Sequence, residues 1–218
     1  MREVFHTELD HLAERLQEMT GLVGAAMGSA TRALLTADLR LAESVIAADA
    51  QVDEAQRELD EQAVRLLARQ APVATDLRTV VASLRMSSSL ERMGDLARHV
   101  ALLARLRYPH SAVPEQLVET FRQMGALDQG IASKAGRVIA TRDLSTAAEL
   151  EKDDDALDDL HRQVFAAMAA PDWPCSAETT ADVTLASRYF ERFGDHAVSL
   201  AHRVVFLVTG DSSPVAAG

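Results

Sequence analysis

Four pairs of acidic residues are spaced four residues apart, so each pair would place two carboxylates on one face of a helix. The pairs are Asp49 with Asp53, Glu91 with Asp95, Asp154 with Asp158, and Glu191 with Asp195. Two carboxylates at this spacing stand about 6 Å apart and repel each other by a few tenths of a kcal/mol. A hard cation removes that repulsion, and oxygen ligands suit magnesium, manganese, calcium or iron. The spacing therefore predicts metal sites, and the simpler alternative is a solvated acidic surface that binds nothing.

The sequence repeats itself across its two halves. A shift of 105 residues superposes the two aspartate pairs, and a shift of 100 superposes Glu91–Asp95 on Glu191–Asp195. The superposed segments read Glu-Arg-Met-Gly-Asp and Glu-Arg-Phe-Gly-Asp, and each follows an aspartate pair at a similar distance. Self-similarity at a fixed period indicates tandem copies of one structural unit. We therefore predict an internal duplication, with two helical units rather than a single unbroken core.

The elements that carry these pairs are predicted to be long helices. The chain has only 10 Gly and 6 Pro among 218 residues, and it is rich in residues that lose little conformational freedom in a helix. Asp38 is a suitable N-cap, and Pro72 and Pro109 end helices because proline lacks the required N–H. The predicted helices cover residues 7–35, 38–71, 73–107, 115–140, 143–169 and 177–209. They define an all-α fold of two tandem three-helix bundles, at 1–109 and 114–210, with a frayed tail at 211–218.

Helical periodicity predicts which way the acidic pairs face. The apolar stripes of the third and sixth helices lie nearly opposite their Glu and Asp side chains, at about 100° per residue. These stripes are Leu90, Met93, Ala97 and Val100, and then Phe190, Phe193, Ala197 and Leu200. In the second helix, Asp49 and Asp53 flank an apolar seam of residues seven apart, namely Val45, Val52, Leu59 and Leu66. The pairs are therefore predicted to lie outside the cores, where neighbouring helices meet at the surface.

Residues beside the pairs suggest further roles. Gly94 and Gly194 cost a helix about 1 kcal/mol each relative to alanine, so we expect something to approach the backbone closely there. Arg92 and Arg192 are expected to pair with the carboxylates if no metal is bound. His99 follows Asp95 by four residues and is a possible ligand in the first copy only. His196 is expected to be a surface residue.

The absence of several catalytic motifs, and the excess of acidic residues, make some classes of function improbable for this chain. Phosphate-loop, dinucleotide-binding and nucleophile-elbow motifs do not occur, which disfavours nucleotide hydrolysis by this chain itself. A ferritin-like di-iron enzyme needs two Glu-x-x-His motifs in the bundle core, and only Glu8 and His11 fit that pattern. With 22 basic and 33 acidic residues the formal net charge is −11, which disfavours nucleic acid as a partner. We therefore predict that the protein is not an enzyme.

The remaining composition indicates a cellular compartment. Apolar runs such as 204–208 are far shorter than the ~20 residues that span a bilayer, and the start lacks the apolar segment of a signal peptide. Cys175 is the single cysteine, which excludes an internal disulfide and fits a reducing compartment. These features predict a cytoplasmic protein without membrane insertion.

Residues 70–78, together with the repeated Glu-Arg-x-Gly-Asp segments and the aspartate pairs, resemble motifs of the PhoU family. Residues 70–78, Gln-Ala-Pro-Val-Ala-Thr-Asp-Leu-Arg, resemble its Q-x-P-V-A-x-D-L-R turn. Residues 90–95 and 190–197 resemble its L-E-R-I-G-D-H-A signature, and the two aspartate pairs match its D-x-x-x-D motif. The chain departs from the family where Leu96 replaces a histidine, and where His99–Leu102 and Ser199–His202 replace N-I-A-E. The resemblance covers nearly the whole chain, in the expected order and in both copies.

The resemblance implies a function that composition and spacing do not. PhoU proteins are negative regulators of phosphate uptake and of phosphate-starvation signalling, and they link the phosphate ABC transporter ATPase to a sensor histidine kinase. The resemblance also implies surface metal clusters on the eight paired carboxylates, with iron, zinc, manganese and magnesium as candidates. We therefore expect a metal-binding regulatory adaptor, with a homodimer as a further expectation. The alternatives are a di-metal redox or hydrolytic enzyme and a helical scaffold without metal.

Overall fold

The computed structural model describes residues 2–210, and these residues form six α-helices, a single 3-10 turn and no strand. The predicted frayed tail at 211–218 lies outside the described residues. The α-helices are α1 (Arg2–Thr36), α2 (Leu39–Gln70), α3 (Ala74–Arg107), α4 (Val118–Thr141), α5 (Leu144–Met168) and α6 (Ala177–Thr209), and the 3-10 turn η1 covers Glu115–Leu117. The predicted all-α fold is confirmed, and most helix ends fall within a few residues of their predicted positions.

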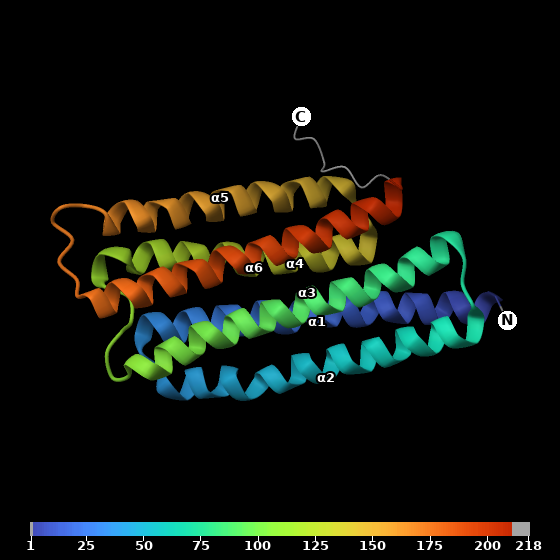
Figure 1. Cartoon of the computed structure of the whole chain (residues 1–218), viewed down its shortest axis with the longest axis horizontal. Helices are drawn as coiled ribbons and strands as arrows, with labels where there is room; N and C mark the ends of the chain where they lie inside the picture. Colours follow the sequence, from blue (N-terminus) through green and yellow to red (C-terminus); the bar gives the residue numbers. More distant parts are fainter. Residues whose placement is uncertain (1, 211–218) are drawn as a thin grey trace.

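The six helices form two three-helix bundles that lie side by side. Helices α1, α2 and α3 pack on one another, and α4, α5 and α6 do the same. The bundles meet through α1 against α4 and through α3 against α6. In Figure 1 the helices α5, α6, α3 and α2 form a layer facing the viewer, with α4 and α1 behind it. Four helices of the two copies thus share one broad face, and all four carry the paired carboxylates.

Local sequence signals begin and end these helices as expected. Asp38 caps α2, because its side-chain Oδ1 accepts a hydrogen bond from the Leu41 N–H at 3.0 Å. Asp143 caps α5 in the same way through the Ser145 N–H, also at 3.0 Å. Helix α2 ends where Ala71 adopts a left-handed conformation, with φ of 41°, directly before Pro72. Capping residues and proline therefore determine where these helices begin and end.

The core is built from the apolar seams that periodicity predicts. All four seam residues of α2 are buried, and the apolar stripes of α3 and α6 are wholly inaccessible to solvent. One expectation is wrong: the buried side chains of the two bundles join in one continuous cluster instead of two. The reason is that α1 and α4 approach each other across the junction through glycines. A Cβ on Gly125 would lie 2.5 Å from Thr31 Cγ2, so the helices could not pack this closely with a larger residue there.

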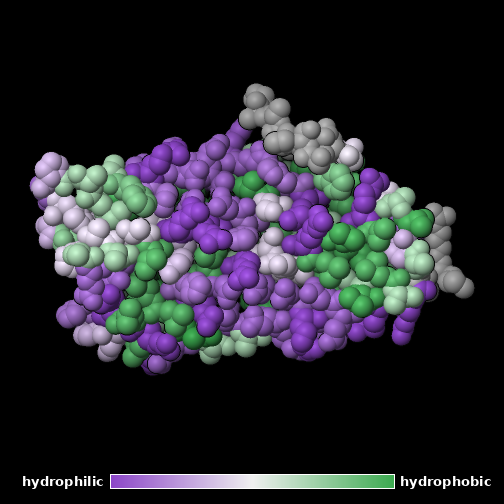
Figure 2. All heavy atoms as spheres, in the orientation of Figure 1, coloured by the Kyte–Doolittle hydropathy of each residue, from purple (hydrophilic) through white to green (hydrophobic). Residues whose placement is uncertain are grey.

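The outer surface is mainly polar. Figure 2 shows hydrophilic side chains over the middle of the face made by α5, α6, α3 and α2, with hydrophobic groups gathered toward its ends. Among the described residues, no helix combines the length and the apolar character that a membrane span requires.

Candidate metal centres

The first cluster joins α2 to α3. Asp49 and Asp53 on α2 face Glu91 and Asp95 on α3, and the helices place Asp49 deepest, with its side chain 11% exposed. The pKa of Asp49 is raised, first by burial and then by the charge of Asp53. The pKa of Glu91 is raised by burial and by Asp95, with smaller contributions from Asp53 and Asp49. The four predicted carboxylates therefore lie near enough to one another, at the seam between α2 and α3, to repel each other.

Two arginines partly neutralise the first cluster. Arg98 on α3 lies between the helices, with its Nε 3.5 Å from Asp49 Oδ2 and a terminal nitrogen 3.5 Å from Asp95 Oδ1. Arg92 lies 3.2 Å from Asp95 Oδ2 and 3.7 Å from Glu91 Oε2. The expected pairing of Arg92 is therefore confirmed, while Arg98 is a bridging residue that the sequence analysis missed. Both arginines thus supply positive charge to these carboxylates.

The second cluster joins α5 to α6 and is less well compensated. Burial and four neighbouring carboxylates, led by Asp158 and Asp195, raise the pKa of Asp154 to about 7. The pKa of Glu191 is raised mainly by burial and then by Asp195. Glu191 pairs through Oε1 with Arg188, yet its Oε2 is buried without a hydrogen-bond partner. Arg192, which we expected to pair here, forms no ion pair with any described residue, so Arg188 takes that role.

The two repeated glycines explain how the helices come so close at each cluster. A Cβ on Gly194 would stand 2.2 Å from Asp154 Oδ1 and 2.7 Å from Leu157 Cδ2. A Cβ on Gly94 would stand 3.1 Å from Val52 Cγ1 and 3.4 Å from Asp49 Oδ1. The close approach predicted at these glycines is therefore that of the neighbouring helix, with the first aspartate of each pair lying against the glycine.

The clustered carboxylates repel one another, and their oxygen atoms are the ligands that a hard cation prefers. Each cluster has four carboxylates from two helices, and in the second cluster one of their oxygens, Glu191 Oε2, is buried without a hydrogen-bond partner. In their present orientations the side chains do not converge, since no group of three His, Cys, Asp or Glu in the described part of the chain could hold a metal ion. Binding would thus require Arg98 or Arg188 to move aside and the carboxylates to turn inward.

The histidines considered as ligands make other contacts. The His99 ring packs against Tyr189 of α6, with ring centroids 5.2 Å apart, and it lies near enough to the first cluster for its charge to lower the pKa of Asp49 slightly. His196 is half-buried rather than on the surface as expected, and burial, then Arg192, lowers its pKa. His11 is exposed and lies 3.0 Å from Glu14, while Glu8 accepts a hydrogen bond from Gln62 at 3.1 Å. The Glu8–His11 motif is therefore not an inward-facing ligand pair.

A fifth acid near the second cluster was missed by sequence reasoning. Asp128 on α4 is wholly buried, neither of its carboxylate oxygens has a hydrogen-bond partner, and its pKa is raised well above the usual value by burial and by Asp154. A signal was present in the sequence, because Asp128 falls in the buried row of Met124, Ile131 and Ala135. The shift of 105 superposes it on Val23, a core residue of α1. The second copy therefore has a buried carboxyl next to its cluster at a position where the first copy has a valine.

Together these features define a class: an all-α protein of two duplicated three-helix bundles with one surface acidic cluster per bundle. Comparison with known proteins agrees with this architecture. The family model described as "PhoU domain" matches residues 16–104 and 121–204, once in each bundle. The chain belongs to the PhoU family.

Individual relatives resemble the chain over nearly its full length. The phosphate-specific transport system accessory protein PhoU homolog 2 of Mycobacterium tuberculosis (strain ATCC 25618 / H37Rv) is 45% identical over 96% of this chain and 99% of its own length. The corresponding homolog 1 of Mycobacterium leprae (strain TN) is 44% identical, over 96% of this chain and 95% of its own length. The crystal structure of PhoU from Pseudomonas aeruginosa superposes with a TM-score of 0.85 at 32% identity, covering 95% of this chain and 100% of that one.

Proposed function

We propose that this protein is a regulatory accessory protein of phosphate transport, which restrains phosphate uptake and phosphate-starvation signalling when phosphate is plentiful. Its relatives are named as accessory proteins of a phosphate-specific transport system. The proposal rests on one observation: both bundles of this PhoU-family fold have a surface carboxylate cluster at the equivalent place. In this role the protein docks in the cytoplasm on the phosphate ABC transporter ATPase and on a sensor histidine kinase, and it has no catalytic turnover.

The metal is part of this proposal. The residues that would hold it are Asp49, Asp53, Glu91 and Asp95 in the first bundle, and Asp154, Asp158, Glu191 and Asp195 in the second. When bound, a divalent or trivalent ion such as iron, zinc, manganese or magnesium supplies the positive charge that relieves the repulsion among these carboxylates. The support is the raised pKa of Asp154 and the buried, unpartnered oxygen of Glu191. Relief of this repulsion would fix α5 against α6 and α2 against α3, which stabilises the face that a partner contacts.

The alternative of a di-metal enzyme receives less support from the geometry. The Glu8–His11 motif faces outward, and the paired carboxylates lie on the outside of the bundles rather than in a central cavity. The exposed aspartates Asp53 and Asp195 are typical of a surface cluster open to a partner protein. We therefore favour the adaptor role over turnover of a small substrate.

A reporter assay in a deletion strain tests the regulatory role. With phosphate plentiful, a strain lacking the gene should express a phosphate-starvation reporter, and the wild-type gene should silence it. A variant with Asp154→Asn and Glu191→Gln should restore silencing only in part, while the matched control Asp159→Asn, on an exposed carboxylate of α5, should restore it fully. An unchanged reporter in the deletion strain would contradict the proposal. Elemental analysis of the same purified variants measures their metal content independently of the reporter assay.

A further inference from the structure

A long groove follows the junction of α1 and α4. It consists of two hollows of about 650 and 380 Å³, and both are lined by Ala25 of α1 and Gln129 of α4. Glycines of both helices form much of the floor, namely Gly21, Gly24, Gly28, Gly125 and Gly136. In Figure 1 the helices α1 and α4 lie behind the layer that carries the paired carboxylates. The groove therefore lies on the face of the protein opposite the two acidic clusters.

The walls of this groove carry arginines and no acid. Arg32 of α1 and Arg122 of α4 line the larger hollow, and Arg137 of α4 lines the smaller one. None of the residues that line either hollow is acidic, although the chain has 33 acidic and only 22 basic residues. Arg122 forms an ion pair with Glu119, Arg32 donates a hydrogen bond to Ser29 Oγ at 3.3 Å, and Arg137 forms no ion pair in the described part of the chain. The groove is thus a positively charged region on an acidic protein.

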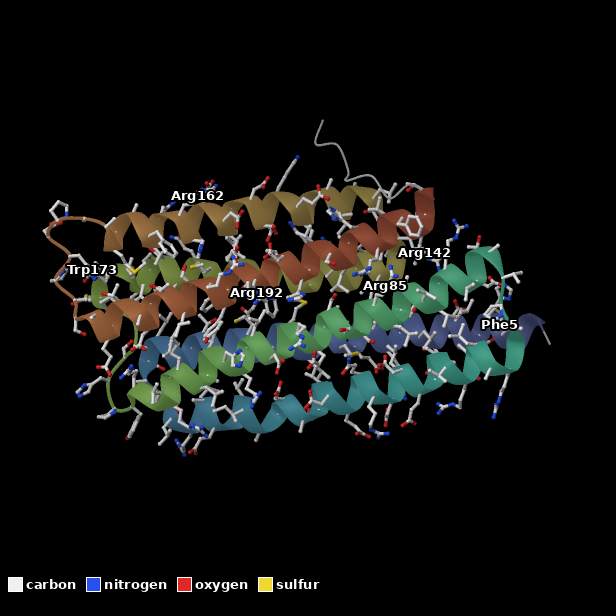
Figure 3. All side chains as sticks on the ribbon, in the orientation of Figure 1. Phe5, Arg85, Arg142, Arg162, Trp173 and Arg192 are labelled. Atoms are coloured by element: carbon white, nitrogen blue, oxygen red, sulfur yellow. The ribbon has the colours of Figure 1, made fainter. Side chains whose placement is uncertain are left out.

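The cationic stretch of the groove is elongated and has a definite end. A third hollow of about 390 Å³ follows it, and there Asp10 and Glu14 of α1 lie beside Arg142. Figure 3 shows Arg142 at this end of α4. The cationic stretch runs from Arg122 to Arg137, which is roughly 22 Å along the helix at 1.5 Å per residue. This length corresponds to about four turns of a second helix and is much longer than a small anion.

We propose that this groove is a docking site for an acidic helical segment of a partner protein. The glycine floor allows a second helix to approach α1 and α4 closely, with its apolar side chains packed on Ala25, Ala126 and Leu35. Carboxylates on the flanks of that helix would pair with Arg32 and Arg122. Charge complementarity selects this occupant, because the same walls repel a basic segment.

The inference rests on the proposed regulatory role, because that role supplies the candidate partners. An adaptor that holds a transporter ATPase and a sensor kinase together needs two docking surfaces, and the groove would be the second, in addition to the face with the carboxylate clusters. The two bundles meet through α1 and α4 as well as through α3 and α6. A helix bound in the groove would therefore contact both bundles at once.

Binding of the full chain to two purified probes tests the electrostatic part of the proposal. The probes are the phosphate transporter ATPase and the cytoplasmic part of the sensor kinase, each measured on a biosensor at several salt concentrations. The Arg32→Glu, Arg122→Glu double variant should weaken binding of one probe about tenfold or more, through slower association, and should reduce its salt dependence. The Arg32→Lys, Arg122→Lys variant keeps both charges and should retain most of the affinity. The matched control is Arg105→Glu, on an exposed arginine of α3, which should bind as the wild type does.

A bulky side chain in the groove provides a test that does not depend on charge. Ala25 is exposed and lines both hollows, so Ala25→Trp should block the groove without disturbing the core. It should weaken binding of the same probe about tenfold, through faster dissociation. The matched control is Ala166→Trp, on an exposed alanine of α5, which should not change the affinity. Circular dichroism of every variant should match that of the wild type.

The outcomes separate the docking site from the regulatory role. Wild-type affinity for both probes in the double glutamate variant or in Ala25→Trp overturns the groove and leaves the regulatory role standing, since the partners then bind elsewhere. Failure of the wild type to bind either probe also overturns it, and the reporter assay then decides independently whether the regulatory role fails as well. Self-association of the wild type in sedimentation velocity, abolished by Ala25→Trp, would assign the groove to a second copy of this chain and contradict the proposal.

Discussion

Gly194 on α6 lies so close to Asp154 on α5 that a Cβ at position 194 would stand 2.2 Å from Asp154 Oδ1. The same glycine thus determines both how near the two helices approach and where the carboxylate is held. Its counterpart Gly94 leaves 3.4 Å to Asp49 Oδ1, which is ordinary contact. The duplicated motif therefore produces a tighter arrangement in the second bundle than in the first.

Alanine at position 194 should destabilise the protein and displace the Asp154 carboxylate. Overpacking costs about 1–3 kcal/mol, and the gain in helix propensity returns about 1 kcal/mol. We therefore expect a net loss of roughly 1 kcal/mol in the free energy of unfolding for Gly194→Ala, and a change near zero for Gly94→Ala. Chemical denaturation followed by circular dichroism measures both. The metal content of Gly194→Ala should also fall, because Asp154 must turn away from the added methyl group.

Gly21 provides the matched control for these two variants. It lies within α1, and a Cβ there would meet no atom within 4 Å. Gly21→Ala should therefore stabilise the protein by about 1 kcal/mol, through helix propensity alone. Equal changes in the free energy of unfolding for Gly21→Ala and Gly194→Ala would show that the contact with Asp154 does not affect stability.

The stability of the metal-free protein should rise as the pH falls from about 8 to about 6. The pKa of Asp154 is about 7 in the folded state, above the ordinary value, mainly because of burial and then Asp158. A raised pKa in the folded state means that folding favours the protonated carboxyl, so its stabilising contribution is present at low pH and lost as pH rises through 7. After allowance for solvent screening we expect about 1–2 kcal/mol. Thermal denaturation across this range measures it.

Asp154→Asn removes the titrating group and should flatten this part of the pH profile. The exposed residue Asp159 serves as the control, since Asp159→Asn should keep the wild-type slope. A slope that persists in Asp154→Asn would assign the effect to another group of the cluster.

Most of the fold follows from local chemistry that the sequence displays. Seven-residue spacing from Val45 to Leu66 predicts the buried seam of α2, and the capping carboxylates of Asp38 and Asp143 mark two helix starts. The repeated glycines and acids place the two clusters on equivalent helix faces, because the spacing between residues fixes the direction of each side chain around a helix. These rules operate within one helix and its immediate turn, which is why they succeed.

The features that were missed depend on pairs of helices. Arg98 and Arg92 both lie near Asp95, but only the packing of α2 on α3 shows that Arg98 also reaches Asp49. The continuous core arises for a similar reason, since it depends on how closely α1 and α4 approach across Gly125.

Arg98 should compete with a metal ion at the first cluster. Its guanidinium lies 3.5 Å from both Asp49 and Asp95, so Arg98→Gln leaves these carboxylates without their bridging cation. We expect a loss of up to about 1 kcal/mol in the metal-free protein, because the pair is partly exposed. The stabilisation gained on adding manganese should increase, as measured by thermal shift. Arg15→Gln, which breaks a similarly exposed pair with Glu58, should lose stability without a larger response to manganese, and equal responses would contradict competition.

Asp128→Val should stabilise the protein, because it replaces an unpartnered buried acid with the residue type found at the equivalent position 23. Both carboxylate oxygens of Asp128 lack a hydrogen-bond partner, and burial raises its pKa well above the usual value. Removing an unsatisfied buried polar group is worth about 1–3 kcal/mol, and the gain should be larger at pH 8 than at pH 5, where the wild-type carboxyl is more fully protonated. Denaturation at the two pH values measures this gain. Asp155→Val, at an exposed neighbour on α5, should change stability by no more than about 0.5 kcal/mol. A destabilised Asp128→Val variant would mean that Asp128 has a bound partner in solution, and the second cluster would then extend into the core.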